Sequence, residues 1–258
     1  MKRKLGLAAL TCIELAPPDL VSAAASAGYD CVGLRLIPVA GQTLPAFEQR
    51  ELERRLADTG LSVLDVEVFR LDPDTDAAPF ESAMALAARM KATELLVHGA
   101  DPDEGRLIES FSQLCELAGR YGLNANLEPM PWVHVSNVAK ARRILAKASM
   151  RNSALLVDPI HFFRADNSFD QLKGAPLRYL QFCDAHPGRP TDVQELMRQA
   201  RGDRLFPGEG GLDLQGLLAA LPPDLPISLE VPHAGPFDAR ERARHALAAT
   251  RKLLGAGR

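Results

Sequence analysis

Three carboxylates stand at the ends of short apolar runs that lie far apart in the sequence: Glu128, Asp158 and Glu230. If those runs are strands of one closed sheet, the three groups face a common point. Ionised carboxylates about 5 Å apart repel one another by roughly 3 kcal/mol per pair at an effective dielectric constant near 20. Shared protons, a nearby arginine or lysine, or a divalent cation would relieve this repulsion, and we favour the cation because of its charge density.

Gln181 ends a further apolar run, between the runs that end at Asp158 and Glu230. Its amide oxygen would complete an all-oxygen ligand set with the three carboxylates. Such a set favours Mn²⁺ or Mg²⁺ and also accepts Co²⁺, whereas Zn²⁺ prefers nitrogen and sulfur ligands. The sequence therefore predicts a Mn²⁺ or Mg²⁺ site formed by Glu128, Asp158, Gln181 and Glu230.

Further polar side chains near the same run ends are candidate substrate contacts: Arg35, Glu67, Arg70, His98, Trp132, Arg164 and Glu209. An arginine fork suits a carboxylate or phosphate group, so the arginines predict an anionic substrate. The alternative is that each arginine pairs with a neighbouring acid, such as Glu67 or Asp166. Trp132 either stacks on a sugar face or packs against a loop. Glu209 lies in a glycine-rich segment that is either a ligand loop or a plain turn.

These side chains need a scaffold that brings the run ends together, and alternating patterns along the chain indicate one. Short apolar runs rich in β-branched residues recur about every 25 to 32 residues, which is typical of successive βα units on a parallel sheet. The expected strands cover residues 4–10, 31–37, 62–69, 93–98, 123–128, 153–158, 178–183 and 226–231. The expected helices cover residues 18–27, 46–59, 78–91, 106–121, 138–147, 193–201, 214–221 (capped by Asp213) and 239–254.

Eight such units predict an α/β fold, a single (β/α)8 TIM-barrel domain over residues 1–258, because closure removes exposed sheet edges and buries each strand on two faces. The longer interval between the seventh and eighth expected strands predicts an extended loop and helix insertion there. A doubly wound open sheet is the rival fold, but residues 10–14 lack the glycine-rich turn that opens that class. A barrel places its catalytic groups at the carboxyl ends of the strands, where the polar side chains are expected.

The composition argues against several other classes of protein. The 30 lysine and arginine residues against 33 acidic residues give a net charge of −3, and no continuous cationic stripe is present for nucleic acid. No apolar stretch is long enough for a membrane span. The four cysteines are widely spaced, which argues against a zinc knuckle or a disulfide framework and favours a reducing, cytoplasmic location. A small molecule is the expected partner, and a homo-oligomer stays open.

Several short motifs occur in a characteristic order: Gly28-Tyr29-Asp30 before Val32-Gly33-Leu34, Asn126-Leu127-Glu128-Pro129, Val157-Asp158-Pro159-Ile160-His161-Phe162, residues 180–184, Gly208-Glu209-Gly210 and Leu229-Glu230. Over nearly its whole length the chain thus resembles the xylose isomerase-like barrels of the sugar phosphate isomerase and epimerase superfamily. The resemblance implies that Glu128, Asp158 and Glu230 are three of four metal ligands and that His161 contacts the substrate. The fourth ligand is usually a histidine in the family, whereas this chain has Gln181, which leaves the identity of the metal open.

The resemblance implies a metal-dependent isomerase or epimerase that acts on a small sugar, sugar phosphate or other polyhydroxylated carbonyl compound. A metal on the carbonyl and hydroxyl oxygens acidifies the neighbouring C–H bond, so that an enediolate forms. Glu128 and Glu230 would transfer the proton, and His161 would hydrogen-bond a substrate oxygen. Two alternatives stay open: a lyase of the dehydroshikimate dehydratase type, which expels water, and a barrel that binds a metabolite without turnover.

Overall fold

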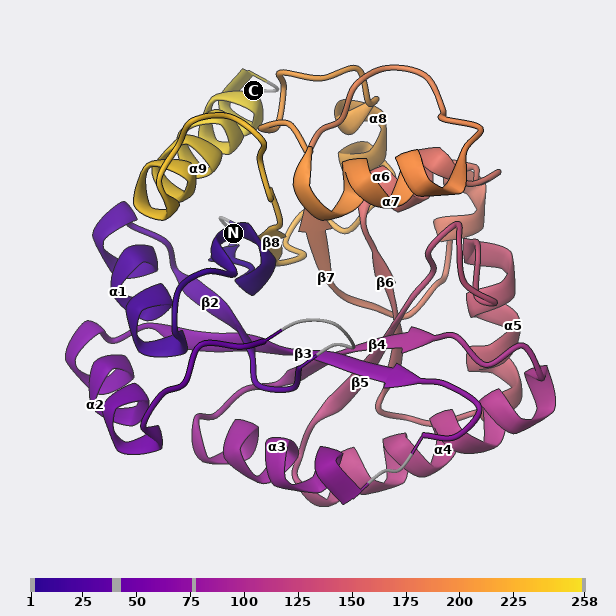
Figure 1. The fold of residues 1–258 in the computed structure, drawn as a ribbon. Helices are drawn as coiled ribbons and strands as arrows, with labels where there is room; N and C mark the ends of the chain where they lie inside the picture. Colours follow the sequence, from indigo (N-terminus) through magenta and orange to yellow (C-terminus); the bar gives the residue numbers. More distant parts are fainter. Residues whose placement is uncertain (1–2, 39–42, 76–77, 257–258) are drawn as a thin grey trace.

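Eight parallel strands close into a barrel in chain order (Figure 1). The structure is a computed structural model that describes residues 3–38, 43–75 and 78–256. The strands are Leu5–Leu7 (β1), Cys31–Arg35 (β2), Ser62–Leu71 (β3), Glu94–Gly99 (β4), Asn124–Glu128 (β5), Ser153–Val157 (β6), Leu177–Phe182 (β7) and Ile227–Leu229 (β8). Pairing of β1 with β8, from Leu5 opposite Ile227 to Leu7 opposite Leu229, closes the sheet. The predicted (β/α)8 barrel is confirmed.

Helices surround the strands on the outside of the barrel (Figure 1). They are Pro17–Ala27 (α1), Gln49–Thr59 (α2), Ala78–Arg89 (α3), Glu104–Arg120 (α4), Val138–Ala148 (α5), Pro159–Arg164 (α6), Val193–Gly202 (α7), Leu214–Ala219 (α8) and Ala239–Ala256 (α9). Each expected helix is present, and α6 is an addition that the sequence pattern did not indicate. The segment between β7 and β8 contains α7 and α8. No helix in the described part of the chain is both long enough and apolar enough to cross a membrane.

Short polar side chains fix the starts of four helices. Asp103, Asn137, Asp192 and Asp213 each accept a hydrogen bond from the backbone N–H three residues later. Such a cap stabilises a helix by about 1 kcal/mol, because it satisfies a backbone donor that the first turn leaves unpaired. The predicted cap at Asp213 is therefore confirmed. The helix expected over residues 46–59 begins only at Gln49, since Glu48 is extended, with φ −94° and ψ 126°.

The first strand is shorter than the range 4–10 that its apolar run predicted, and a 3-10 turn at Ala9–Cys12 follows it. The chain bends there because Thr11 joins it to the end of β8. Thr11 Oγ1 donates to the carbonyl of Leu229 at 2.7 Å and accepts from the N–H of Val231 at 2.8 Å. These buried bonds hold the β1 and β8 ends together, which fixes the rim of the barrel beside Glu230.

The interior of the barrel contains a carboxyl group, Asp65 on β3, that is fully buried. Its two oxygens have no hydrogen-bond partner among the described residues. The group occupies space that Gly33 leaves on the neighbouring strand β2, since a Cβ atom on Gly33 would lie 2.7 Å from Asp65 Oδ1. Burial, and then the charges of Glu67 and Glu230, raise the pKa of Asp65 well above its ordinary value. Burial therefore favours the protonated, neutral form of Asp65 in the folded protein.

Asp65→Asn is expected to flatten the dependence of stability on pH. In the wild type the folded state keeps a proton that the unfolded state loses above pH 3.8, the ordinary pKa of this side chain. The free energy of unfolding should therefore fall as the pH rises above that value, by up to about 1.4 kcal/mol per pH unit until the folded-state pKa is reached. Asparagine has no such proton. Urea unfolding at several pH values between 4 and 8 measures the two slopes.

The exposed Asp166 supplies the control for this comparison, since its side chain is 93% exposed and pairs with Arg189 at the surface. Asp166→Asn is expected to keep the wild-type slope. Equal slopes for Asp65→Asn and the wild type would contradict the assignment of Asp65 as a neutral acid.

Candidate active site

The carboxyl ends of the strands bring Glu128, Asp158 and Glu230 together at one mouth of the barrel. Glu128 is the last residue of β5, Asp158 directly follows β6, and Glu230 directly follows β8. All three are buried, and their charges interact, because those of Asp158 and Glu230 both act on Glu128. These three residues, which span 103 positions of the sequence, thus form one acidic cluster in space.

Glu128, Asp158 and His161 form a candidate metal site. One ligand atom from each lies within 4.8 Å of those of the other two. Asp158 caps α6, where its Oδ1 accepts the N–H of Ile160 at 2.9 Å, and this places His161 on the first turn of the helix. Glu128 Oε1 and His161 Nδ1 are buried and have no partner among the described residues. Buried polar atoms of this kind normally have a ligand or water as partner.

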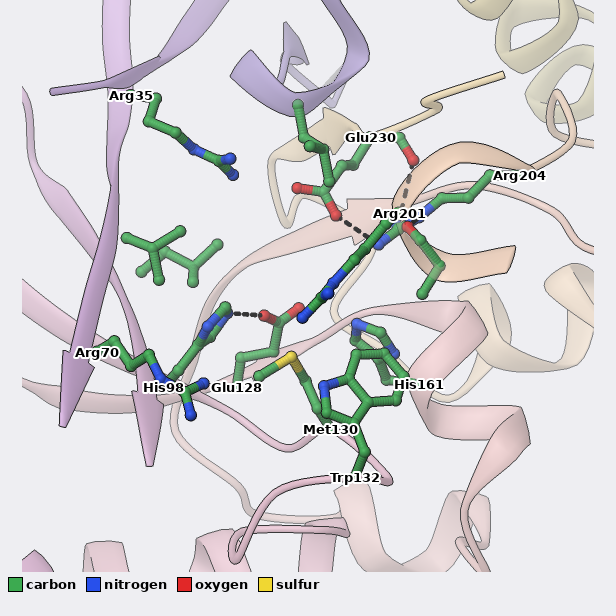
Figure 2. Close-up of a pocket in the computed structure, with 14 residues that line it drawn as sticks. Arg35, Arg70, His98, Glu128, Met130, Trp132, His161, Arg201, Arg204 and Glu230 are labelled. Atoms are coloured by element: carbon green, nitrogen blue, oxygen red, sulfur yellow. Dashed lines mark hydrogen bonds and ion pairs between the residues drawn. The ribbon is translucent and has the colours of Figure 1, made fainter. Parts of the chain in front are cut away.

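A fully buried arginine that the sequence pattern did not indicate, Arg204, holds two of the carboxylates. Its Nη1 lies 2.5 Å from Asp158 Oδ2. Its Nη2 lies 2.7 Å from Glu230 Oε2 (Figure 2). The backbone carbonyl of Ala200 accepts from its Nε at 2.7 Å. Arginine was one of the expected ways to relieve the repulsion, and here it neutralises part of the cluster.

The pKa values of the cluster follow from burial and from this arginine. Burial, and then the charges of Asp158 and Glu230, raise the pKa of Glu128 well above its ordinary value. Burial raises the pKa of Glu230 to about 8 although Arg204 opposes it. Burial alone would raise the pKa of Asp158, but Arg204 and His161 outweigh it and hold the pKa below its ordinary value. If all three groups were ionised, they would therefore carry more negative charge than Arg204 alone accommodates, and in the metal-free protein the raised pKa values of Glu128 and Glu230 favour their neutral forms.

The donor set suits a divalent cation. With all three carboxylates ionised, Arg204 leaves a net charge of two negative units, which one divalent ion balances. Gln181 Nε2 donates to Glu230 Oε1 at 2.8 Å, and Gln181 Oε1 is buried without a partner among the described residues. Unpartnered oxygens on Glu128 and Gln181 are thus available beside the excess charge. The metal identity and the ligand role of Gln181 stay predictions.

The cluster opens into a cavity of about 340 Å³ that arginines line on both sides. Figure 2 shows Arg35 and Arg70 on one wall and the Arg201 side chain reaching inward from the opposite side. Arg35 pairs with Glu67 at 2.7 Å, and Arg70 pairs with Asp72 at 2.8 Å. Arg201, which was not a predicted site residue, forms no hydrogen bond or ion pair with any described residue. It is therefore the arginine with its full charge available to a ligand.

Two histidines and the single tryptophan complete the cavity wall. His98 Nε2 and Glu128 Oε2 share a hydrogen bond of 2.8 Å. Trp132 meets His161 edge to face, with ring centroids 5.0 Å apart, so it borders the cavity and packs against a site residue at once. Burial lowers the pKa of His161 to about 4 and that of His98 well below its ordinary value. Both rings are neutral near pH 7 and can exchange hydrogen bonds without adding charge.

Three of the expected substrate contacts lie away from the cavity. Arg164 is buried, and its Nη2 donates to the carbonyl of His186 at 2.7 Å and to Gln199 Oε1 at 2.9 Å, because α6 turns its side chain towards α7. Glu209 is exposed on the loop after α7. Glu67 is fully buried behind Arg35. These three expectations are corrected: position near a strand end did not determine the direction of the side chain.

A family model described as "Xylose isomerase-like TIM barrel" matches residues 21–253. Two curated proteins named 3-dehydroshikimate dehydratase are similar to the chain, one from Pseudomonas aeruginosa at 28% identity and one from Pseudomonas putida at 26%. Each match covers 92% of this chain and 39% of the relative. The chain thus spans about two fifths of the length of these relatives.

Solved structures share the fold over nearly the whole chain. The IOLI protein with a bound zinc atom has a TM-score of 0.82 and 17% identity, and the match covers 98% of both chains. A xylose isomerase-like TIM barrel/4-hydroxyphenylpyruvate dioxygenase fusion protein has a TM-score of 0.80 and 22% identity, covering all of this chain and 44% of that one. At these identities the likeness concerns the fold alone.

Proposed function

The chain belongs to the xylose isomerase-like TIM barrel family, and from that premise we propose that it is a divalent-metal-dependent lyase. The proposed reaction is loss of water from a small hydroxylated carbonyl compound that carries a carboxylate group. The observation that carries the proposal is the cavity itself. Arg201, which has no hydrogen bond or ion pair among the described residues, lines it together with Glu128 and Glu230, two of the carboxylates proposed to bind the metal. A substrate with a carbonyl group and a carboxylate would meet both.

Isomerisation was the first expectation from the sequence. The relatives instead support dehydration. Both curated relatives are named 3-dehydroshikimate dehydratase, and their matches extend over nearly all of this chain. A dehydratase and an isomerase of this kind begin in the same way, with removal of a proton next to a carbonyl group. They differ in whether a hydroxyl group then leaves from the adjacent carbon. We therefore propose 3-dehydroshikimate as the first substrate to test.

Glu128, Asp158, Gln181 and Glu230 would hold the metal ion, and their oxygen atoms favour Mn²⁺ or Mg²⁺. When bound, such an ion polarises the substrate carbonyl and makes the adjacent C–H bond more acidic. His161 is the alternative ligand, because its ring nitrogen lies within reach of Glu128 and Asp158. A nitrogen ligand in the set would make Zn²⁺ or Co²⁺ a better fit.

The protein's own groups would move the proton. Glu128 accepts the proton from the carbon next to the carbonyl, while the hydrogen bond from His98 keeps its carboxylate in position. A carbon–carbon double bond forms as the hydroxyl group leaves, and the proton held by Glu128 passes to the departing oxygen to give water. His161, which is neutral and whose Nδ1 has no partner among the described residues, would hydrogen-bond a substrate oxygen during this step. Trp132 covers His161 on one side and limits the access of water.

Incubation of the purified protein with 3-dehydroshikimate and Mn²⁺ tests the proposed function. We expect the loss of one water per molecule by mass spectrometry and a new ultraviolet absorption band from the more conjugated product. The same incubation in D₂O distinguishes the alternatives. A substrate that gains deuterium but keeps its water would support the isomerase instead, and a substrate that neither gains deuterium nor loses water would contradict the lyase.

Arg201→Ala is expected to raise KM for a carboxylate-bearing substrate by about 10- to 100-fold with a smaller effect on kcat. A hydrogen bond to a charged group contributes about 1.5 to 3 kcal/mol, and this one would form equally in the ground state and the transition state. Arg198→Ala is the matched control, because Arg198 lies on the same helix but pairs with Glu195 and Asp203 at the surface. Steady-state kinetics of both variants measure the effect; equal KM values for them would remove Arg201 from the binding site.

A further inference from the structure

Asp184 is a buried carboxylate just beyond β7 that binds the loop following α7. It is 1% exposed. Its Oδ2 accepts the N–H groups of Gly208 and Gly210, each at 3.0 Å. Its Oδ1 accepts the N–H groups of Ala185 at 2.9 Å and Leu212 at 3.1 Å. Three of the four donors thus belong to the glycine-rich segment, whose backbone N–H groups at Gly208, Gly210 and Leu212 bind this side chain.

The backbone of Asp184 also binds the backbone of Leu205, the residue that directly follows Arg204. The N–H of Leu205 donates to the carbonyl of Asp184, and the N–H of Asp184 donates to the carbonyl of Leu205, both at 2.9 Å. Arg204 itself donates its N–H to the carbonyl of Pro232 at 3.0 Å. The backbone at Arg204 is therefore fixed between the ends of β7 and β8. From there its side chain reaches Asp158 and Glu230.

The loop approaches Asp184 so closely that only glycine fits at residue 210. A Cβ atom on Gly210 would lie 2.3 Å from Asp184 Oδ1 and 2.4 Å from the backbone oxygen of Ala185. Such distances are far below van der Waals contact, so a side chain at this position would push the loop away. The four hydrogen bonds and the close approach depend on each other.

We infer that Asp184 is the positioning residue for Arg204, and that it acts by fixing the loop at residues 205–212 to the end of β7. This inference rests on the proposed function, in which Asp158 and Glu230, the two carboxylates that Arg204 contacts, would hold the metal. Asparagine at position 184 would keep one acceptor oxygen and turn an NH₂ group towards backbone N–H groups that need an acceptor. The loop would become more mobile. The backbone position from which the Arg204 side chain reaches its carboxylates would then no longer be fixed.

Asp184→Asn and Gly210→Ala are expected to weaken Mn²⁺ binding by about 10- to 100-fold, the usual effect of losing a group that orients metal ligands. Isothermal titration calorimetry measures the affinity, and hydrogen exchange at residues 208–212 should quicken in both variants. Asp213→Asn is the matched control, since Asp213 accepts a single N–H at the exposed start of α8. It should bind Mn²⁺ as the wild type does. Thermal unfolding followed by circular dichroism establishes that each variant is folded.

An Arg204→Met background separates positioning from a general structural role. If Asp184 acts through Arg204, Asp184→Asn should weaken Mn²⁺ binding no further in that background. The inference is overturned if Asp184→Asn or Gly210→Ala binds Mn²⁺ like the wild type, or if the loss from Asp184→Asn is the same with and without Arg204. Failure of the wild type itself to bind Mn²⁺ would instead refute the proposed function.

Discussion

Glu128→Gln is expected to weaken Mn²⁺ binding by more than about 100-fold and to lower kcat/KM by about 1,000-fold, which corresponds to about 4 kcal/mol of transition-state stabilisation. Glu128 has both roles in the proposed site: its Oε1, which has no partner among the described residues, would bind the metal, and the same carboxylate would accept the substrate proton. The amide is nearly the same size but has one weak oxygen ligand and no basic oxygen. Calorimetry and initial rates measure the two losses.

The metal-free stability of this variant separates a site effect from a folding effect. Burial and the charges of Asp158 and Glu230 disfavour ionised Glu128, so a neutral amide should leave the unfolding free energy of the metal-free protein unchanged or higher. Glu94→Gln is the matched control, because Glu94 is also buried but begins β4, at the other end of the barrel, where Asn124 and Asn126 bind it. Wild-type Mn²⁺ affinity in Glu128→Gln would remove Glu128 from the site.

Arg204→Met is expected to lower the free energy of unfolding of the metal-free protein by about 3 to 5 kcal/mol, the usual effect of removing one partner of a buried ion pair. Methionine keeps much of the volume but leaves Asp158 and Glu230 without the cation that both now contact. Mn²⁺ should stabilise this variant less than it stabilises the wild type, since Asp158 and Glu230 are no longer oriented to bind the ion. Urea unfolding with and without Mn²⁺ measures both effects.

Arg198→Met gives the comparison for this loss. Arg198 lies on α7, six residues before Arg204, and forms its ion pairs at the surface, where their contribution is about 0 to 1 kcal/mol. The variant should therefore be nearly as stable as the wild type. Similar stabilities for Arg198→Met and Arg204→Met would show that the buried pairing at Asp158 and Glu230 does not hold the site together.

The acidic part of the site was predictable because strand register determines it. Glu128, Asp158 and Glu230 each follow an apolar run, and in a barrel the carboxyl ends of all strands meet at one mouth. The runs themselves were visible since strands buried on both faces are almost continuously apolar. The apolar runs therefore predicted the barrel, and the position of the acidic residues at the ends of the runs predicted the cluster.

The basic part of the site was not predictable in the same way, because a long side chain can point in several directions from one backbone position. Arg198, Arg201 and Arg204 recur every three residues, as arginines do on an exposed helix face, yet Arg204 is buried and the exposed Arg201 lines the cavity. Arg204 follows the end of α7 and precedes the apolar Leu205, a change of pattern that could have indicated burial. Arg164 was expected at the cavity, but the unexpected helix α6 turns its side chain away from the cavity and towards α7.

Gln181 departs from the family pattern, and its contacts in the structure indicate what it does at the site. A neutral amide in place of the usual histidine left the identity of the metal open, although its oxygen was an expected ligand. In the structure its Nε2 holds Glu230, and its Oε1 stays unpartnered among the described residues. The residue therefore supplies both an orienting hydrogen bond and a free oxygen, which is consistent with a metal site built mainly from oxygen atoms.

Anomalous diffraction from crystals grown with Mn²⁺ tests the metal site most directly. We predict a single strong manganese peak in the cavity, bound by Glu128, Asp158 and Glu230, with Arg204 retained beside it. A manganese peak bound elsewhere, or a saturated crystal in which Arg204 bridges Asp158 and Glu230 with no ion near Glu128, would contradict the account.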